Sequence, residues 1–229
     1  MISVIIPTFN AETTLGPTLA ALVPAAVAGL VREVIVVDGG SSDRTTAIID
    51  HAGANLVHGS LGRGHQLGTG AARARFPWLL FLHADTALAP GWEQEACSFI
   101  EGVTRQQRPL AAAAFRFALD DRGARPRLLE RLVALRCAAF GLPYGDQGLL
   151  IPKTLYEAIG GYRALTLMED VDLVRRLGRG RVVLLRTPAV TSAERFRREG
   201  YARRSVRNLL CLTLYALRVP LHVIGRIYG

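Results

Sequence analysis

Polar side chains that could contact a ligand follow three apolar runs in the first half of the chain. Thr8 follows the first run, Asp38 follows the second, and His83 and Asp85 follow the third. A carboxylate such as that of Asp38 can accept a hydrogen bond from the N–H of a uracil-like base. The carboxylate of Asp85 can bind a hard divalent cation, which prefers oxygen ligands. These four residues are therefore the first candidates for a ligand site.

The segments that must position these residues alternate between strand and helix. Short apolar runs predict strands, and the longer stretches between them predict helices. The predicted strands cover 3–7, 33–37, 54–58 and 78–82, and the predicted helices cover 12–30, 43–51 and 66–75. This alternation predicts an α/β fold with a parallel sheet and right-handed crossovers. Ligands bind beyond the carboxyl ends of such strands, so we expect Thr8, Asp38, the 59–64 loop and Asp85 to converge.

The second half of the chain is less regular and more basic. Its patterns predict strands at 111–119, 148–151 and 182–185, and helices at 90–101, 126–140, 153–159, 169–177 and 194–217. We expect the arginines of 126–140 on the outer face of their helix. Residues 1–100 carry five arginines and eight acidic residues, a net charge of −3, whereas residues 101–229 carry 23 basic and 11 acidic residues, a net charge of +12. Such a half could bind phosphate-bearing molecules, a membrane surface or nucleic acid.

Length and composition exclude several classes of protein. At 229 residues and 50% hydrophobic content, the chain can bury a sizeable core and is not disordered. Three widely spaced cysteines exclude a disulfide scaffold and indicate a reducing compartment. The N-terminus lacks the features of a signal peptide. The apolar stretch 208–217 is too short to cross a bilayer but could lie on one, so we expect a cytoplasmic protein with the option of peripheral membrane contact.

The strand-end residues belong to motifs that follow one another in a fixed order, at residues 5–10, 36–45, 81–86, 160–162 and 168–177. This ordered set resembles the family 2 glycosyltransferases of the GT-A fold over about residues 2–190. The resemblance implies an α/β GT-A fold, with a mostly parallel, Rossmann-like sheet flanked by helices. It also implies a catalytic domain at 1–190, in which 1–100 binds the nucleotide sugar and 101–190 the acceptor. Residues 191–229 would form a basic, amphipathic, helical C-terminal extension.

The donor site of this family corresponds to the first two strand ends and the loop before the third helix. In the family, the aspartate at the position of Asp38 contacts the nucleotide base, and the neighbouring base-contacting motif corresponds here to Pro7, Thr8 and Asn10. Arg63 lies in the family's glycine-and-basic loop and would supply positive charge. The resemblance thus implies a nucleotide-sugar donor, with a UDP-sugar favoured. If the resemblance is set aside, Asp38 could be an aspartate in a turn, and Arg63 could be an ordinary charged residue in a loop.

Asp85 closes the Asp-x-Asp signature of the family. The resemblance implies that it binds a divalent cation, Mn²⁺ or Mg²⁺, which neutralises the departing diphosphate. His83 stands where the family has its first aspartate. A neutral His83 could still hydrogen-bond the ribose, or it could be a histidine packed at a strand end.

Asp170 matches the general base of inverting family members, which removes the proton from the acceptor hydroxyl. Without the resemblance, Glu169 and Asp170 are acidic residues at a helix start, where the helix dipole favours negative charge. We expect Glu169 and Asp172 to play supporting or capping roles.

Two further segments could add to the site. Residues 145–148 resemble a motif of a bacterial subgroup of these transferases, some of whose members are linked to arsenosugar biosynthesis. Asp146 and Gln147 could hydrogen-bond the donor sugar or the acceptor, or form a polar turn. Arg195 and Arg198 fall on one helical face and could hold the diphosphate, or face solvent.

Taken together, these motifs predict a metal-dependent, inverting glycosyltransferase that moves a sugar from a nucleotide sugar to an unknown acceptor hydroxyl. Phosphate-bearing and lipid-linked acceptors are both open, as is an oligomer through the C-terminal helix. The alternative is a catalytically inactive GT-A-fold binding or scaffold protein, which His83 in place of aspartate motivates. We expect no nucleic-acid partner, because the basic half has no recognisable reader motif.

Overall fold

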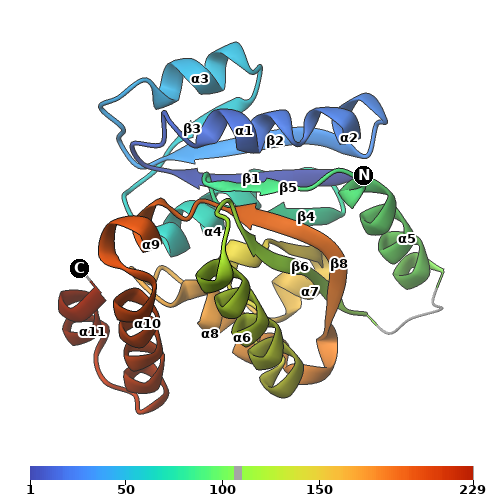
Figure 1. The fold of residues 1–229 in the computed structure, drawn as a ribbon. Coiled ribbons are helices and arrows are strands. Elements are labelled where there is room, and N and C mark those ends of the chain that lie inside the picture. Colours follow the sequence, from blue (N-terminus) through green and yellow to red (C-terminus); the bar gives the residue numbers. More distant parts are fainter. Residues whose placement is uncertain (106–109, 229) are drawn as a thin grey trace.

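The computed structural model describes residues 1–105 and 110–228 and contains an eight-stranded sheet with helices on both faces (Figure 1). The strand order is β3-β2-β1-β4-β7-β6-β8-β5. The strands are β1 (Ile2–Thr8), β2 (Val31–Asp38), β3 (Asn55–His58), β4 (Trp78–Phe81), β5 (Thr86–Leu88), β6 (Ala112–Leu119), β7 (Leu149–Pro152) and β8 (Val182–Thr191). This architecture confirms the predicted α/β class.

The first four strands form the parallel part of the sheet, as predicted. β1 pairs in parallel with β2 on one side and β4 on the other, and β3 pairs in parallel with β2. All seven residues of β1 are buried, because helices cover both faces of the sheet at this central strand. Thr8 lies opposite Asp38 in the β1–β2 register, so the first two candidate residues are neighbours at the carboxyl ends of these strands.

The second half of the sheet is mixed. β7 is antiparallel to both β4 and β6, β6 is parallel to β8, and β5 is antiparallel to β8. β5 is absent from the sequence prediction because a three-residue strand is too short to show periodicity. β8 continues six residues beyond the predicted end at residue 185. Arg186, Thr187 and Pro188 interrupt the apolar run there, but pairing with β5 and β6 carries the strand past them.

The helices lie mostly where the sequence predicts them. They are α1 (Leu15–Ala20), α2 (Val23–Val27), α3 (Thr45–His51), α4 (Arg63–Arg73), α5 (Trp92–Thr104), α6 (Ala124–Phe140), α7 (Lys153–Ala158), α8 (Glu169–Leu177), α9 (Glu194–Glu199), α10 (Tyr201–Ala216) and α11 (Leu221–Tyr228), with short 3-10 turns η1 (Gly145–Gln147) and η2 (Arg179–Arg181).

Two helix predictions are wrong in the same way. The single helix predicted at 12–30 is two short helices, with Pro24 in the first turn of the second, a position where proline is well tolerated. The single helix predicted at 194–217 is broken at Gly200, whose φ of 87° is incompatible with a right-handed helix. α9 therefore turns away from α10, and α11 follows as a separate C-terminal helix (Figure 1).

The hydrophobic core has two main layers, one on each face of the sheet, with the largest buried side chains on the α5 side including Trp92 and Phe99. A smaller cluster joins the C-terminal helices to the start of α8. There Met168 and Val171 pack with Cys211 of α10 and Ile224 of α11. This packing holds the C-terminal helices beside the start of α8, which carries Asp170. No helix within residues 1–105 and 110–228 combines the length and apolar character needed to span a membrane.

Candidate active site

A cavity of about 550 Å³ brings together six of the twelve predicted site residues. The six come from separate segments: the start of α4, the residues after β4, η1, the start of α8 and α9. They are Arg63, His83, Asp85, Asp146, Asp170 and Arg195. Four of them are acidic or imidazole side chains and two are arginines. Thr8 and Asp38, which we expected to converge with Asp85, do not line this cavity.

Asp170 is held in place by backbone N–H groups. Its Oδ2 accepts a hydrogen bond from the Gly145 N–H at 2.6 Å, and its Oδ1 accepts one from the Val171 N–H at 2.8 Å. A Cβ atom on Gly145 would lie 2.5 Å from Nε2 of His83 and 3.2 Å from Oδ2 of Asp170. A residue without a side chain at 145 thus allows His83 and Asp170 to approach the same backbone segment.

Glu169 is buried beneath this cavity and faces Arg63. The Arg63 Nε lies 3.1 Å from Glu169 Oε1, at ion-pair distance but without hydrogen-bond geometry. Burial raises the pKa of Glu169 to about 7, with a further contribution from Asp170, although Arg63 opposes the rise. Burial alone would lower the pKa of Arg63, but Glu169 and Asp170 raise it above its ordinary value. Both carboxylate oxygens of Glu169 lack a hydrogen-bond partner among the described residues, so this pair is incompletely satisfied.

Asp146 is the second carboxylate whose environment opposes its charge. Burial raises its pKa to about 6, and the negative charges of Asp170 and Asp85 add to the rise, although Arg136 opposes it. Its Oδ1 is buried and has no hydrogen-bond partner in the described structure. Such an atom is normally paired, so this one is available to a ligand.

His83 is neutral at physiological pH. Burial and the positive charge of Arg63 lower its pKa to about 4. A neutral imidazole can donate one hydrogen bond and accept another, which is compatible with contact to a ligand hydroxyl.

The predicted base-contacting residues lie together at the ends of β1 and β2. None of them lines the cavity. Asp38 Oδ2 accepts hydrogen bonds from the backbone N–H groups of Gly40 and Ser41, at 3.0 and 2.8 Å. Its Oδ1 accepts from the hydroxyls of Ser41 and Thr8, at 2.5 and 3.3 Å. Burial raises the pKa of Asp38, but these hydrogen bonds outweigh burial and hold it below its ordinary value.

Two amides fix the same edge of the sheet. Gln66 of α4 donates from Nε2 to the carbonyls of Thr8 and Val37, both at 2.8 Å. Asn10 has a φ of 49° and accepts the Ser42 N–H on its Oδ1 at 2.9 Å. Pro7 is buried inside β1, directly before Thr8. This edge is thus held by its own hydrogen bonds.

Gln147 and Arg198 are not among the residues that line the cavity. Gln147 is buried, and its Nε2 donates to the Phe115 carbonyl at 2.9 Å while its Oε1 accepts from Cys137 and Arg136. Its amide therefore links η1 to β6 and α6. Arg198 is exposed, with Glu199 3.9 Å away, whereas Arg195 on the same helix reaches the cavity.

Arg136 of α6 lines the cavity, contrary to the expectation that the arginines of this helix lie on its outer face. It is half-buried, and its Cζ lies 3.7 Å from the centre of the Tyr144 ring. One signal in the sequence could have identified it. Arg136 lies three and seven positions after Val133 and Leu129, which places all three on one helical face.

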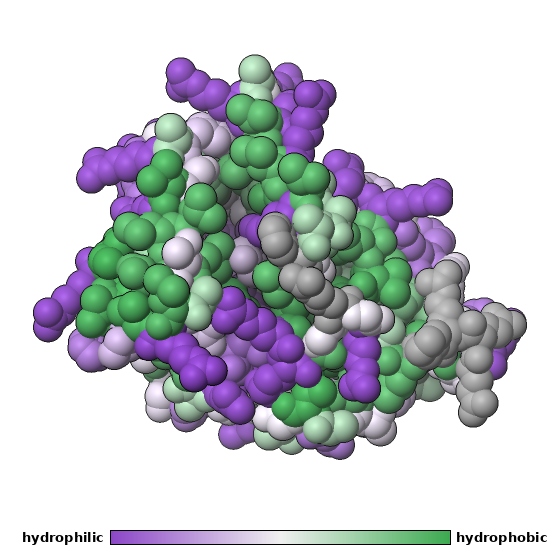
Figure 2. All heavy atoms as spheres, turned by 90° about the horizontal axis from the view of Figure 1, so that it is seen from below, coloured by the Kyte–Doolittle hydropathy of each residue, from purple (hydrophilic) through white to green (hydrophobic). Residues whose placement is uncertain are grey.

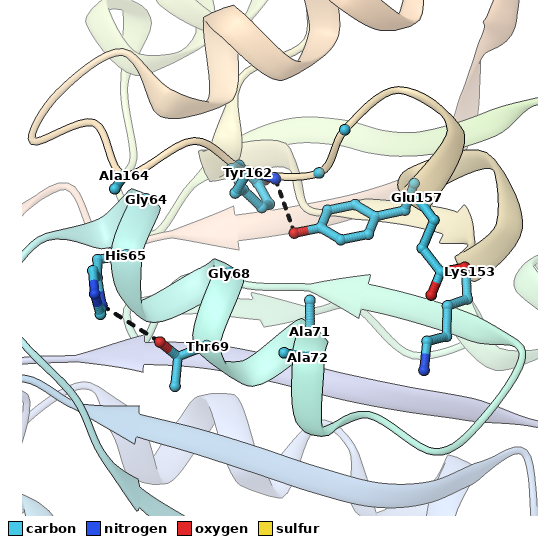
Figure 3. A pocket seen from close by; sticks show the side chains of 13 residues that line it. Gly64, His65, Gly68, Thr69, Ala71, Ala72, Lys153, Glu157, Tyr162 and Ala164 are labelled. Atoms are coloured by element: carbon cyan, nitrogen blue, oxygen red, sulfur yellow. Dashed lines mark hydrogen bonds between the residues drawn. The ribbon is translucent and has the colours of Figure 1, made fainter.

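A second cavity, of about 590 Å³, lies between α4 and the segment 160–164 (Figure 3). The backbone N–H of Tyr162 donates to the hydroxyl of Tyr156 at 2.9 Å, and Thr69 is hydrogen-bonded to His65. None of the twelve predicted site residues lines it. The chemistry therefore belongs to the first cavity.

A divalent cation would find an incomplete set of protein ligands. Within residues 1–105 and 110–228, no group of three or more His, Cys, Asp or Glu side chains is arranged to hold a metal ion. Asp85 lines the cavity with Asp146 and Asp170, but these three carboxylates are not arranged as a metal-ligand group. Magnesium-like cations are commonly bound by one or two carboxylates together with substrate phosphates. The residues present fit a cation whose other ligands come from a bound diphosphate.

Solved structures with similar folds are glycosyltransferases. Glucosyl-3-phosphoglycerate synthase from Mycobacterium tuberculosis, in complex with Mn²⁺, UDP and glucosyl-3-phosphoglycerate, is 21% identical, with 92% of this chain and 78% of that chain covered and a TM-score of 0.59. Mannosyl-3-phosphoglycerate synthase from Rubrobacter xylanophilus is 19% identical, with 93% and 74% covered and a TM-score of 0.60. S. aureus TarS 1–349, in complex with UDP, is 19% identical, with 99% and 69% covered and a TM-score of 0.61.

These likenesses establish the GT-A fold, and a sequence match covers the first part of the chain. No curated protein matches the chain. Residues 3–104, which contain β1 to β5 and the first strand-end motifs, match the family model of glycosyl transferase family 2. Residues 3–104 thus match glycosyl transferase family 2, and the chain has the fold of the GT-A glycosyltransferases.

Proposed function

We propose that the chain transfers a sugar from a nucleotide sugar, a UDP-sugar by preference, to an acceptor hydroxyl with inversion at the anomeric carbon. The observation that carries the proposal is the shared cavity of Asp85 and Asp170. One carboxylate lies within the family-matching segment, between β4 and β5, and the other lies at the start of α8. A transferase needs a site for the leaving diphosphate beside a base for the acceptor, and these two residues supply the two parts.

The nucleotide would bind along the carboxyl ends of β1 and β2. Asp38 and Thr8 would contact the base, and Pro7 and Asn10 would shape the loop around it. Support comes from their shared position at the strand ends and from UDP in similar solved structures. Asp38 accepts its hydrogen bonds in this structure from its own loop and from Thr8 at the end of β1. Base binding would therefore exchange the Ser41 or Thr8 hydroxyl for the base N–H.

The diphosphate would lie near Arg63 and Arg195, whose guanidinium groups can bind phosphate oxygens. Both arginines line the cavity with Asp85. A divalent cation held by Asp85, when bound, would neutralise charge on the diphosphate as its bond to the sugar breaks. Mn²⁺ accompanies UDP in the glucosyl-3-phosphoglycerate synthase complex.

Asp170 would act as the general base for a single displacement. The acceptor oxygen forms a bond to the anomeric carbon, the bond from that carbon to the diphosphate oxygen breaks, and the nucleoside diphosphate leaves with the electron pair. The acceptor proton passes to the Asp170 carboxylate. The N–H groups of Gly145 and Val171 fix that carboxylate in one orientation. His83 and Asp146 would hydrogen-bond the sugar or ribose hydroxyls between the two ends of the site.

The test is binding and hydrolysis of UDP- and GDP-sugars by the purified protein, with and without Mn²⁺ or Mg²⁺. We expect UDP-glucose and Mn²⁺ together to raise the melting temperature, because a ligand of the native state stabilises it. Slow release of UDP should depend on the cation. Absence of any nucleotide-sugar binding under all metal conditions would overturn the proposal. Donor binding without turnover on any acceptor would favour the inactive scaffold instead.

A further inference from the structure

One wall of the catalytic cavity is largely apolar, although Arg136, Arg204, Ser205 and Asn208 also line it. It consists of one face of α6 and one face of α10, which belong to the acceptor half and to the C-terminal extension. The apolar side chains of this wall are Leu129, Leu132, Val133 and Leu135 from α6, and Leu209 and Leu212 from α10. We call this wall the α6–α10 groove. It is part of the same cavity as Asp170 and does not form a separate pocket.

Several leucines of the groove are exposed to solvent although they are large and apolar. The relative exposure is 54% for Leu132, 66% for Leu135 and 66% for Leu209. Burying such a side chain away from water is favourable. Exposed apolar groups that gather in one place commonly mark a binding surface.

The exposed apolar side chains are unevenly distributed over the described residues. Eight of the fifteen large ones lie on α6 or in the C-terminal helices and their connection: Leu128, Leu132, Leu135, Val206, Leu209, Leu210, Leu217 and Val223. Viewed from below, hydrophobic residues gather over the C-terminal helices and again towards the centre of the face, with a recessed surface between them (Figure 2). The apolar surface therefore surrounds the groove.

The position of the groove identifies its occupant. A ligand in the groove lies against α6 and α10 and, without leaving the cavity, reaches Asp170 and Arg195. A second protein laid over this face would close the route by which an acceptor approaches the general base. The occupant must then be part of the acceptor itself. Its reactive end meets charged and polar groups, and the rest of it meets leucines.

We propose that the acceptor is a lipid: a molecule with a hydroxyl at one end, placed at Asp170, and an alkyl or isoprenoid chain in the α6–α10 groove. This inference rests on the proposed function, because it names the acceptor class for the same displacement. The hydroxyl oxygen becomes bonded to the sugar and its proton goes to Asp170, while the chain takes no part in the reaction. Leu132 and Leu209 then determine specificity by binding the chain from the two sides.

The test measures binding of 1-alkanols from butanol to octanol to the full chain by calorimetry. While the chain lengthens within the groove, each methylene should tighten binding about fourfold, the factor that corresponds to burying one CH₂. Leu209→Glu and Leu132→Glu should each weaken octanol binding on the order of tenfold and flatten the dependence on chain length. Both positions are exposed, so neither substitution disturbs the core.

Each variant has a matched control on the same helix. Val206 of α10 is 66% exposed, the same as Leu209, and Leu128 of α6 is 59% exposed, close to Leu132. Neither lines the cavity. Val206→Glu and Leu128→Glu should bind octanol as the wild type does.

Three outcomes would overturn the inference. They are alkanol binding that does not depend on chain length, equal losses in the groove and control variants, and a concentration-dependent dimer that Leu209→Glu dissociates. Binding of UDP-glucose with Mn²⁺, measured on the same wild-type sample, separates this result from the function itself. If the nucleotide sugar binds and the alkanols do not, the lipid acceptor is wrong and the transferase stands. If the nucleotide sugar does not bind, the proposed function fails first.

Discussion

The two polar regions of this protein differ in how well their charges are satisfied. At the ends of β1 and β2, Asp38 accepts four hydrogen bonds and its pKa lies below the ordinary value. In the cavity and directly beneath it, buried oxygens of Asp146 and Glu169 have no hydrogen-bond partner in the described structure, and their pKa values rise to about 6 and about 7. The first region is complete without a ligand, whereas the second is not.

This difference indicates separate tasks for the two regions. The preformed region at the ends of β1 and β2 can bind a nucleotide with little rearrangement, which keeps the entropic cost of binding low. Buried carboxylate oxygens without hydrogen-bond partners are costly to the folded state, and perturbed pKa values of this kind concentrate at functional sites. We therefore expect changes in the first region to affect mainly stability and nucleotide affinity. Changes in the second should affect turnover and the dependence of stability on pH.

The largest effect should come from Asp170→Asn in the cavity. An amide cannot take the acceptor proton, so kcat for transfer should fall about 10²- to 10⁴-fold. The affinity for UDP should change little, and steady-state kinetics with calorimetry of UDP binding would measure both. Glu194→Gln is the control, because Glu194 is exposed on the neighbouring helix α9 and does not line the cavity. Full transfer activity in Asp170→Asn would remove the assignment of the base.

The next largest effect should come from Asp38→Asn at the end of β2. The substitution replaces an acceptor with an amide that faces the N–H groups of Gly40 and Ser41. We expect the free energy of unfolding to fall by about 3 kcal/mol, because hydrogen bonds to a charged group are lost in a buried place. Urea denaturation would measure it. The control is Asp50→Asn at the exposed end of α3, which should leave the free energy of unfolding unchanged. Equal losses of stability in the two variants would contradict the view that the hydrogen bonds of Asp38 hold this region together.

Glu169→Gln should alter how stability depends on pH. The pKa of Glu169 is raised to about 7 in the folded protein, above its ordinary value of 4.5. The folded state then binds the proton more tightly than the unfolded state does, so the contribution to stability is complete below about pH 4.5 and is lost as pH rises through 7. The free energy of unfolding of the wild type, relative to Glu169→Gln, should fall by about 3 kcal/mol between pH 4.5 and 8.

Urea denaturation of both proteins at several pH values would measure this difference. Subtracting the variant removes the contributions of the other titrating groups. A difference that stayed constant with pH would mean that Glu169 is well paired in the folded protein, and the contrast between the two regions would lose one of its supports.

The smallest effect concerns two glycines of α4, the helix that connects the regions (Figure 3). A Cβ on Gly64 would lie 2.4 Å from the Arg163 carbonyl oxygen, whereas a Cβ on Gly68 would meet nothing nearer than the Tyr162 carbonyl oxygen at 3.6 Å. Gly64→Ala should therefore destabilise by about 1–3 kcal/mol through overpacking. Gly68→Ala should stabilise by up to about 1 kcal/mol, because alanine favours helix. Thermal unfolding of the two variants would measure both signs, and destabilisation of both would contradict the geometry.

Much of the nucleotide-side structure could be predicted from the sequence. The alternation of apolar runs and amphipathic stretches gives the first four strands, and the rule that ligands bind at carboxyl strand ends brings Thr8 and Asp38 together. The spacing within 129–136 also contained the signal for Arg136, although we expected that side chain on the outer face. Strand period and strand-end position are local properties, so a single sequence carries them.

The tertiary structure decided which side chains reach the cavity and what state their charges are in. Gln147 and Asp146 are adjacent in sequence, but one is enclosed by β6 and α6 and the other lines the cavity. Gly200 turns the predicted long helix into α9 and α10, and α10 then becomes a wall of the groove. The pKa of a carboxylate such as Glu169 depends on burial and on charges far away in the sequence. Those quantities exist only once the chain has packed, so the sequence could name the residues of the site but not their surroundings.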